Sequence, residues 1–377
     1  MAVKIITFFL ISAYFIVSAS CLKSPTGSDD TSSIVVSDFQ AEVGDREVEL
    51  NWINPRYPGY KGTLIKRNSK KYVDIEPTYG TEIYRGTGTT VVDTGLTNFT
   101  TYYYSAFTFD EGDNFYFPMT VQVQPLPEGT ELIRFIHSEY GWIEIMMASI
   151  PAGSFQMGSN TGREDERPVH TVSLDAFMMS NTEITQLQYK SVMGKNPSTQ
   201  AENDNSPVEF AHWQEAVTFC NRLSEKAGLE PCYNLDTWEC DFSRNGIRLP
   251  TEAEWEYACR AGTGTEYFSG NSESDLSLVG WYAGNCRWLQ EVRGKDPNSW
   301  GLFDMHGNVS EFCNDIYGAY SSKSEHNPTG PVSNSHDRVV RGGSWYEESA
   351  DSCRSAGRSC LDWYDRRQYI GFRIVCR

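Results

Sequence analysis

Alternating polar and apolar residues characterise the chain between residues 35 and 125. Residues 47–52 read EVELNW, and residues 89–92 and 102–107 are also rich in β-branched and aromatic side chains. Alternation with a period of two is typical of a strand that buries one face, and glycines together with Pro55 provide turns between the segments. About seven short strands in roughly 90 residues indicate a β-sandwich.

Beyond residue 140 the pattern changes to long loops and three helices. The predicted helices cover residues 185–194, 213–226 and 251–259. Thr185 and Thr251 each begin a capping box, because Gln or Glu follows three residues later. Gly194 and Gly228 end the first two helices.

The N-terminus carries a short apolar run, residues 5–17, which is too short to span a membrane comfortably. With Lys4 before it and small residues after it, this run predicts a secretory signal peptide over residues 1–20. The sequence Ser-Ala-Ser-Cys resembles a relaxed bacterial lipobox, so Cys21 is predicted to carry a lipid, and the alternative is an ordinary cleaved signal. Residues 21–34 are small and polar, as in a tether. We expect an exported lipoprotein of a bacterial cell envelope, periplasmic or surface-exposed, that is anchored to the membrane.

The composition limits the class of partner. The chain has 377 residues, a formal net charge of -18 and no cluster of Lys and Arg. Nucleic acids require a basic surface, so they are excluded as partners, and solubility explains the charge. No Ser-His-Asp order and no phosphate-binding glycine loop stands out.

Cysteine usage agrees with export. Ten cysteines are present, and an oxidising compartment favours disulfides over free thiols. Besides Cys21 nine remain, so at least one has no partner. Cys232 and Cys240 bracket a short loop and are predicted to pair with each other.

Residues 35–125 resemble a fibronectin type III domain. Trp52 stands where that family has its core tryptophan, and Tyr102 follows Leu96 by six residues, as in its tyrosine corner. The absence of cysteine from this segment agrees with that family. A spacer is expected, an adhesive module is the alternative, and residues 126–139 are the predicted linker.

Residues 140–377 resemble the formylglycine-generating-enzyme family, also called the sulfatase-modifying-factor domain. The blocks that carry the resemblance, in order, are residues 150–159, 166–177, 183–194, 206–224, 248–262, 300–312, 338–345, 353–358 and 371–373. The resemblance implies an α+β fold of the C-type-lectin-like kind, with little regular secondary structure and structural calcium. The expected fold class is therefore multidomain, an all-β sandwich followed by this α+β fold.

The resemblance implies two calcium sites, because calcium prefers six to eight hard oxygen ligands. The first would use the side chains of Asp304 and Glu311 and the carbonyl groups of Gly307 and Val309. The second would begin at Asn285 and the carbonyl group of Cys286. The segment after Cys286 is shorter than in the family, which weakens the second site, and a calcium-free turn is the alternative for both.

The resemblance also implies two disulfides. Cys220 pairs with Cys376 and Cys259 with Cys353 by family position, and each bridge stabilises by about 2–4 kcal/mol. Cys286, Cys313 and Cys360 have no assigned partner.

Catalytic family members bind copper(I) through two cysteines about three and eight residues after a GGS turn, and they convert a substrate cysteine to formylglycine. Soft thiolates are the ligands that copper(I) selects. In this chain Glu347 and Ser352 stand three and eight residues after Ser344. Copper is therefore not expected, and enzymatic activity is in doubt.

Two functions follow from these observations. The first is a binding or scaffold protein with a calcium-stabilised pocket for an extended peptide or a glycan, lined by Arg341, Ser344, Trp345 and Arg354. The second is a formylglycine-generating oxidase that acts on sulfatase-type substrates through a displaced or altered metal site. The missing thiolate pair favours the first.

Overall fold

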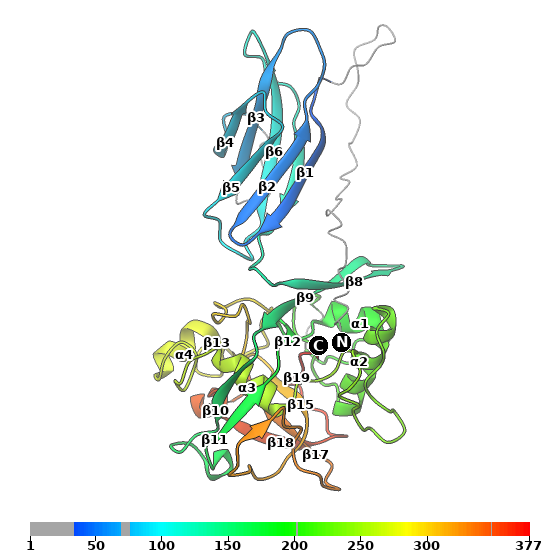
Figure 1. Cartoon of the computed structure of the whole chain (residues 1–377), viewed down its shortest axis with the longest axis vertical. Coiled ribbons are helices and arrows are strands. Elements are labelled where there is room, and N and C mark those ends of the chain that lie inside the picture. Colours follow the sequence, from blue (N-terminus) through cyan, green and yellow to red (C-terminus); the bar gives the residue numbers. More distant parts are fainter. Residues whose placement is uncertain (1–33, 69–75, 201–202, 348) are drawn as a thin grey trace. The chain divides into compact units, whose positions relative to one another are not determined.

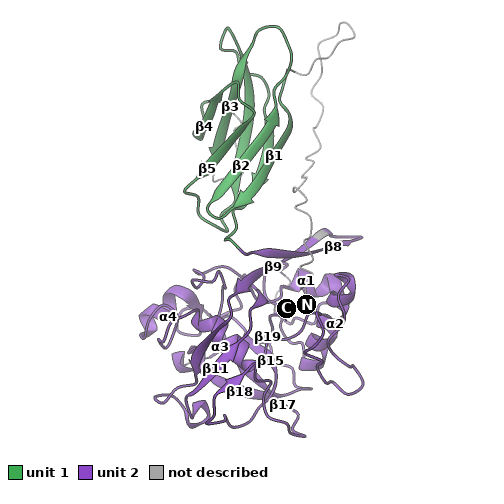
Figure 2. Cartoon of the chain, viewed as in Figure 1, with its two compact units in different colours: residues 1–128 green, residues 129–377 purple. Residues whose placement is uncertain are grey.

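The computed structural model describes residues 34–68, 76–200, 203–347 and 349–377. The chain divides into two compact units, residues 1–128 and 129–377 (Figure 2). The predicted signal peptide, Cys21 and the tether up to residue 33 lie outside the described residues. Within the described ranges, no helix has the length and apolar character needed to cross a membrane.

Unit 1 folds as two antiparallel sheets, with strand orders β1-β2-β5 and β4-β3-β6-β7 (Figure 1). The strands are β1 (Ser37–Gly44), β2 (Glu47–Ile53), β3 (Tyr60–Asn68), β4 (Thr81–Gly86), β5 (Thr90–Thr94), β6 (Tyr102–Asp110) and β7 (Met119–Val123). The predicted strands are confirmed.

The core of unit 1 lies between its two sheets. Leu50 and Trp52 of β2 are buried against Tyr104 of β6, so apolar alternation along each strand supplies one face of the core. The hydroxyl group of Tyr102 accepts a hydrogen bond from the backbone N–H of Thr97 at 3.0 Å. This bond ties β6 to the turn that precedes it.

Unit 2 contains four small sheets within its described residues, with strand orders β20-β12-β9-β8, β18-β17-β15-β19, β10-β11-β16 and β13-β14. The strands are β8 (Glu131–His137), β9 (Gly141–Ile150), β10 (Gly153–Met157), β11 (His170–Leu174), β12 (Phe177–Ser180), β13 (Gly280–Trp281), β14 (His306–Gly307), β15 (Ser310–Ile316), β16 (Glu325–His326), β17 (Asp337–Arg341), β18 (Arg358–Asp362), β19 (Ile370–Gly371) and β20 (Val375–Cys376).

The predicted linker is wrong for residues 131–137, which form β8. This strand pairs with β9 along its whole length, and Phe135 is buried in the core of unit 2. The compact unit therefore begins at Gly129. The four apolar residues in β8, at positions 132, 133, 135 and 136, do not alternate with polar ones, so the segment lacked the period-two signal of a strand.

The helices of unit 2 are α1 (Gln186–Met193), α2 (Trp213–Lys226), α3 (Glu252–Arg260) and α4 (Glu273–Val279), with 3-10 turns η1 (Glu164–Glu166) and η2 (Ala350–Cys353). The first three confirm the predictions, including both capping boxes at Thr185 and Thr251. Helix α4 was missed, although Ser272 and Asp275 form a third capping box at its start.

Buried ion pairs surround α3, and two of the arginines in them, Arg341 and Arg358, belong to β17 and β18. Glu254 accepts two hydrogen bonds from Arg248, at 2.6 and 2.7 Å, and Glu252 accepts two from Arg358, both at 2.7 Å. Glu256 forms ion pairs with Arg260 and Arg341. Each of the three glutamates of α3 is thus matched by at least one guanidinium group.

Candidate functional site

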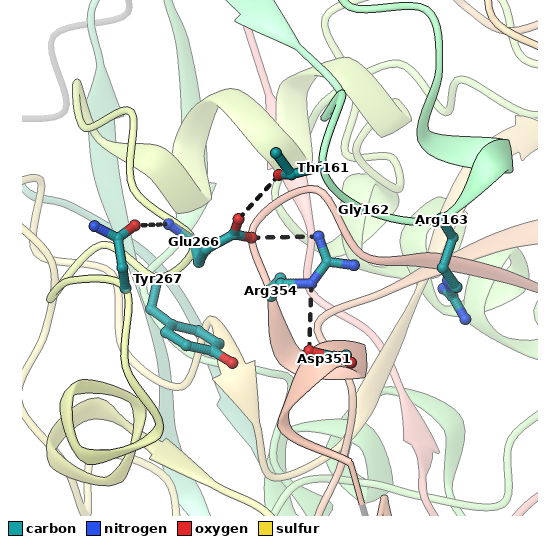
Figure 3. Close-up of a pocket in the computed structure, with 8 residues that line it drawn as sticks. Thr161, Gly162, Arg163, Glu266, Tyr267, Asp351 and Arg354 are labelled. Atoms are coloured by element: carbon teal, nitrogen blue, oxygen red, sulfur yellow. Dashed lines mark hydrogen bonds and ion pairs between the residues drawn. The ribbon is translucent and has the colours of Figure 1, made fainter.

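A polar cavity of about 340 Å³ opens on the surface of unit 2 (Figure 3). Three segments supply its wall: the loop around η1, the loop after α3 and the turn η2. The lining residues are Thr161, Gly162, Arg163, Glu266, Tyr267, Asn271, Asp351 and Arg354. We refer to this cavity as the polar pocket.

Arg354 forms the floor of the polar pocket. Its buried guanidinium group donates two hydrogen bonds to Glu166, at 2.6 and 2.9 Å, and a longer one to Glu266 at 3.3 Å. The bonds to Glu166 raise the pKa of Arg354, so it stays charged. A Cβ atom at Gly162 would overlap the Glu166 carboxylate, which explains why glycine stands above this pair.

The rim of the pocket carries carboxylates that remain accessible. The side chain of Asp351 is 80% exposed and lies 3.9 Å from Arg354, and that of Glu266 is 32% exposed. Thr161 donates a hydrogen bond to Glu266 at 3.4 Å. The guanidinium group of Arg354 is already paired with Glu166. The hydrogen-bond acceptors that remain accessible to a ligand are therefore the carboxylates of Glu266 and Asp351 at the rim.

Of the four predicted pocket residues, only Arg354 lines this cavity. The prediction is wrong for Arg341, which is 1% exposed and donates to the carbonyl groups of Ala356 and Gly357 as well as to Glu256. Its position in β17 turns it into the core. Ser344 and Trp345 are also buried and do not line the polar pocket.

The segment after the GGS turn holds no exposed thiol pair. Glu347 and Ser352 are both partly exposed, while Cys353, one position further, is fully buried. Burial raises the pKa of Cys353, and the charge of Glu347 raises it further. In the described ranges, no group of three or more His, Cys, Asp or Glu side chains is arranged to hold a metal ion.

His306 lies beside the buried thiols and is fully hydrogen-bonded. Its Nδ1 donates to the carbonyl oxygen of Cys353 at 2.7 Å, and its Nε2 accepts from the backbone N–H of Phe268 at 3.1 Å. Burial lowers its pKa to about 4. The ring is therefore neutral and structural, with no nitrogen left for a metal or a proton transfer.

The structure has all nine of its described cysteines as free thiols, so none of the three predicted disulfides is formed in it. The thiols of Cys232 and Cys240 interact, because the hydrogen bond between them lowers the pKa of Cys232 and raises that of Cys240. Cys313 and Cys360 lie on β15 and β18, which β17 separates.

A surface group of serine, histidine and aspartate escaped the sequence analysis. Ser173 Oγ lies 3.0 Å from Nδ1 of His326, whose Nε2 lies 3.6 Å from Asp175. However, Asn327 donates to Nε2 at 3.1 Å, and Ser173 donates to the carbonyl oxygen of Glu325 at 3.3 Å. The histidine proton is then on Nδ1, so the ring does not act as a base for Ser173.

The first predicted calcium site falls within the buried turn that leads into β15. Asp304 is 2% exposed, and its Oδ2 accepts the backbone N–H of Arg293 at 2.8 Å. Within the described residues no donor reaches its Oδ1, and burial raises its pKa to about 6. Asp304 therefore offers a hard oxygen to a cation. Glu311 does not, because Arg373 and Trp255 occupy both of its oxygens.

The second predicted calcium site does not fit a metal. Asn285 accepts the N–H of Tyr282 at 3.0 Å and donates to the carbonyl oxygen of Gly280 at 2.8 Å. The thiol of Cys286 donates to the carbonyl oxygen of Tyr282. The Asn285 side chain thus closes a turn, and neither end of its amide remains for an ion.

The small sheets, the capped helices and the GGS turn of unit 2 define a domain of the sulfatase-modifying type. Residues 144–377 match the family described as sulfatase-modifying factor enzyme 1-like domain, so the chain belongs to this family. The match covers more than half of the chain and includes the polar pocket.

Several known proteins are similar to this chain. Chaperone protein LppX of Paenibacillus barcinonensis is 32% identical over an alignment of 177 residues, and the match covers 38% of this chain and 63% of LppX. The formylglycine-generating enzyme of Bos taurus is 27% identical over 280 residues, 61% of this chain and 74% of that enzyme. The structure of Treponema denticola variable protein 1 aligns with a TM-score of 0.60 and 34% identity, over 66% of this chain and 99% of that one. The chain thus spans less than two thirds of LppX.

Proposed function

We propose that this protein is a calcium-stabilised binding member of its family and that it does not act as an oxidase. One observation carries the proposal: Glu347 and Ser352 occupy the positions at which the catalytic members have their copper-binding cysteines. Carboxylate and hydroxyl oxygens are hard ligands and do not select copper(I). Cys353 cannot replace them where it lies, because it is fully buried.

The polar pocket is the proposed binding site. Its volume of about 340 Å³ admits one side chain of an extended peptide or one sugar ring of a glycan. Rim carboxylates at Glu266 and Asp351 would accept hydrogen bonds from amide, ammonium or hydroxyl groups. In this proposal calcium stabilises the fold and takes no part in chemistry, with Asp304 and the carbonyl groups of Gly307 and Val309 among its ligands.

The similarity to a relative named a chaperone, LppX, supports a binding role. From the apolar run and the Ser-Ala-Ser-Cys sequence at the N-terminus, we also propose that the chain is an exported lipoprotein anchored through Cys21. Unit 1 would then act as a spacer of the fibronectin type III kind.

The test has a catalytic arm and a binding arm. With copper(I), oxygen and a Cys-x-Pro-x-Arg peptide, mass spectrometry is expected to find the peptide thiol unchanged, while a formylglycine-generating enzyme converts it to an aldehyde. Conversion by this chain would defeat the proposal. In peptide and glycan arrays, Asp351→Asn is expected to weaken whatever the wild type captures, whereas Asp113→Asn in unit 1 leaves it unchanged.

An oxidase with a displaced metal site is the second candidate, and one observation favours it. Cys286 lies close enough to Cys353 for its charge to raise the pKa of Cys353. Substituting Cys286 by Ala would abolish peptide oxidation if that pair were the metal site.

A further inference from the structure

Two exposed aromatic rings lie on the surface of unit 2, outside the polar pocket. Trp288 is 66% exposed and Tyr346 is 55% exposed, and neither of them lines that pocket. Trp288 belongs to the loop after β13, and Tyr346 follows the GGS turn and Trp345. Apolar side chains that are exposed together, rather than singly, mark an interaction surface, so the arrangement of these rings decides what they can bind.

Backbone contacts hold the loop after β13 beside the segment after the GGS turn. The N–H of Ala283 donates to the carbonyl oxygen of Glu347 at 3.2 Å. The buried Asn308 connects the two segments at a second place. Its side chain accepts the N–H of Gln290 at 3.1 Å, and its carbonyl oxygen accepts that of Trp345 at 2.9 Å. The two exposed rings are thus carried by segments that are fixed to each other.

The buried ring of Trp345 lies between the two exposed rings. Its centroid is 6.5 Å from that of Trp288, with an interplanar angle of 31°, and 5.5 Å from that of Tyr346, with an angle of 81°. The rings of Trp288 and Tyr346 therefore cannot be parallel, and with Trp345 they form what we call the aromatic corner. Tyr369 stacks on Tyr346 at 5.2 Å and 3°, which fixes the ring before any ligand binds.

Polar side chains of both signs flank the aromatic corner. Arg287 precedes Trp288 and is exposed, and Glu347 follows Tyr346 and is partly exposed. One positive and one negative group leave the corner without a net charge that would attract an ionic ligand. The formal charge of -18 on the whole chain also repels acidic polymers. A guanidinium donor and a carboxylate acceptor are the partners that the hydroxyl groups of a neutral sugar require.

We infer that the aromatic corner binds a neutral glycan, with one pyranose ring against Trp288 and Tyr346. The face of an aromatic ring carries partial negative charge, so it attracts the C–H groups on the face of a sugar ring. Hydroxyl groups at the sugar edge then reach Arg287 and Glu347. A protein partner needs about 800 Å² on each side and a centre depleted of charge, whereas charged residues stand directly beside both rings. The inference goes beyond the proposed function, because the aromatic corner is separate from the polar pocket.

The experiment is affinity electrophoresis of the full chain in native gels that contain hydroxyethyl cellulose, galactomannan or soluble starch, which are neutral polysaccharides. At least one of them is expected to retard the wild type. Trp288→Ala and Tyr346→Ala are each expected to weaken binding about tenfold, the ratio that corresponds to losing one ring contact. Tyr346→Phe keeps the ring and should keep binding. Tyr79→Ala, at a 62% exposed tyrosine of unit 1, is the matched control and should migrate as the wild type.

The other outcomes overturn the inference in distinguishable ways. It fails if none of the three polysaccharides retards the wild type, or if only acidic polygalacturonate does. If Asp351→Asn abolishes retardation while Tyr346→Ala keeps it, the glycan binds in the polar pocket, so the inference fails and the proposed function stands. A wild-type dimer in sedimentation that Tyr346→Ala dissociates, without retardation by a glycan, would show that a second copy covers the corner. Should Tyr346→Ala not fold, Trp288→Ala decides, because unchanged retardation of that variant contradicts the inference.

Discussion

Two of the regions in which unit 2 buries carboxylates differ in how many of the carboxylate oxygens have a hydrogen-bond donor. Along α3, the three glutamates each meet the guanidinium group of at least one arginine. Around the turn before β15, Glu183 and Asp304 each leave one oxygen without a donor in the described part of the chain. A buried carboxylate is matched when each of its oxygens accepts a hydrogen bond, and it then has a structural role. A buried carboxylate with an oxygen that lacks a donor is unmatched, and it indicates a position where a further binding partner is expected.

Breaking a matched pair is expected to produce the largest effect. Glu254→Gln leaves the buried guanidinium group of Arg248 without its counter-charge, which costs about 3–5 kcal/mol in free energy of unfolding. Urea denaturation measures the loss. The double variant Arg248→Met, Glu254→Leu should recover most of it, because removing both charges leaves no buried ion unpaired. A single-variant loss below about 1 kcal/mol would show that the pair is not matched as described.

The matched region also predicts how stability depends on pH. Burial alone would raise the pKa of Glu254 and Glu256, but the charges of Arg248 and Arg341 outweigh it and lower both below the ordinary value of 4.5. A carboxylate with a lowered folded-state pKa contributes stability above its unfolded pKa and loses it as pH falls through the folded value. Melting temperatures should therefore decline below about pH 4.5. Glu254→Gln should show a shallower decline, and an equal slope would contradict the assignment.

In the unmatched region, replacing a buried carboxylate by its amide should stabilise the protein, whereas the same change in α3 should destabilise it. In chelator, Asp304→Asn removes a charge whose pKa burial raises to about 6, so a gain on the order of 1 kcal/mol is expected. Denaturation in chelator measures this gain. A loss similar to that of Glu254→Gln would erase the distinction between the two regions.

The sequence predicted local structure well, because the signals are local. The capping boxes at Thr185 and Thr251 place each helix start through hydrogen bonds that span three residues. Alternation in β2 likewise requires only neighbouring positions. The capping-box rule would also have found α4. It would not have found β8, whose apolar residues do not alternate and whose strand is defined by its pairing with β9.

The candidate site could not be predicted in the same way, because its residues are brought together by contacts between distant parts of the chain. Arg341 was predicted to line a pocket, yet its partner Glu256 lies 85 residues away along the chain and holds it in the core. Glu183 belongs to a block that carried the family resemblance, but Asp304 is on a distant turn. Only the fold reveals that each has one oxygen without a donor among the described residues. Composition cannot show which buried charges are matched.

The smallest change in the free energy of unfolding is expected for an exposed ion pair on the surface of unit 1. Lys61 and Asp113 form an ion pair at 2.8 Å, but their side chains are 47% and 66% exposed, so water screens the attraction. Lys61→Ala should change the free energy of unfolding of unit 1 by less than about 1 kcal/mol, as measured by urea denaturation. The distance between Lys61 and Asp113 is within a few tenths of an ångström of the nitrogen–oxygen distances in the α3 ion pairs. If Lys61→Ala destabilised the protein nearly as much as Glu254→Gln, distance rather than burial would set the strength of an ion pair in this chain.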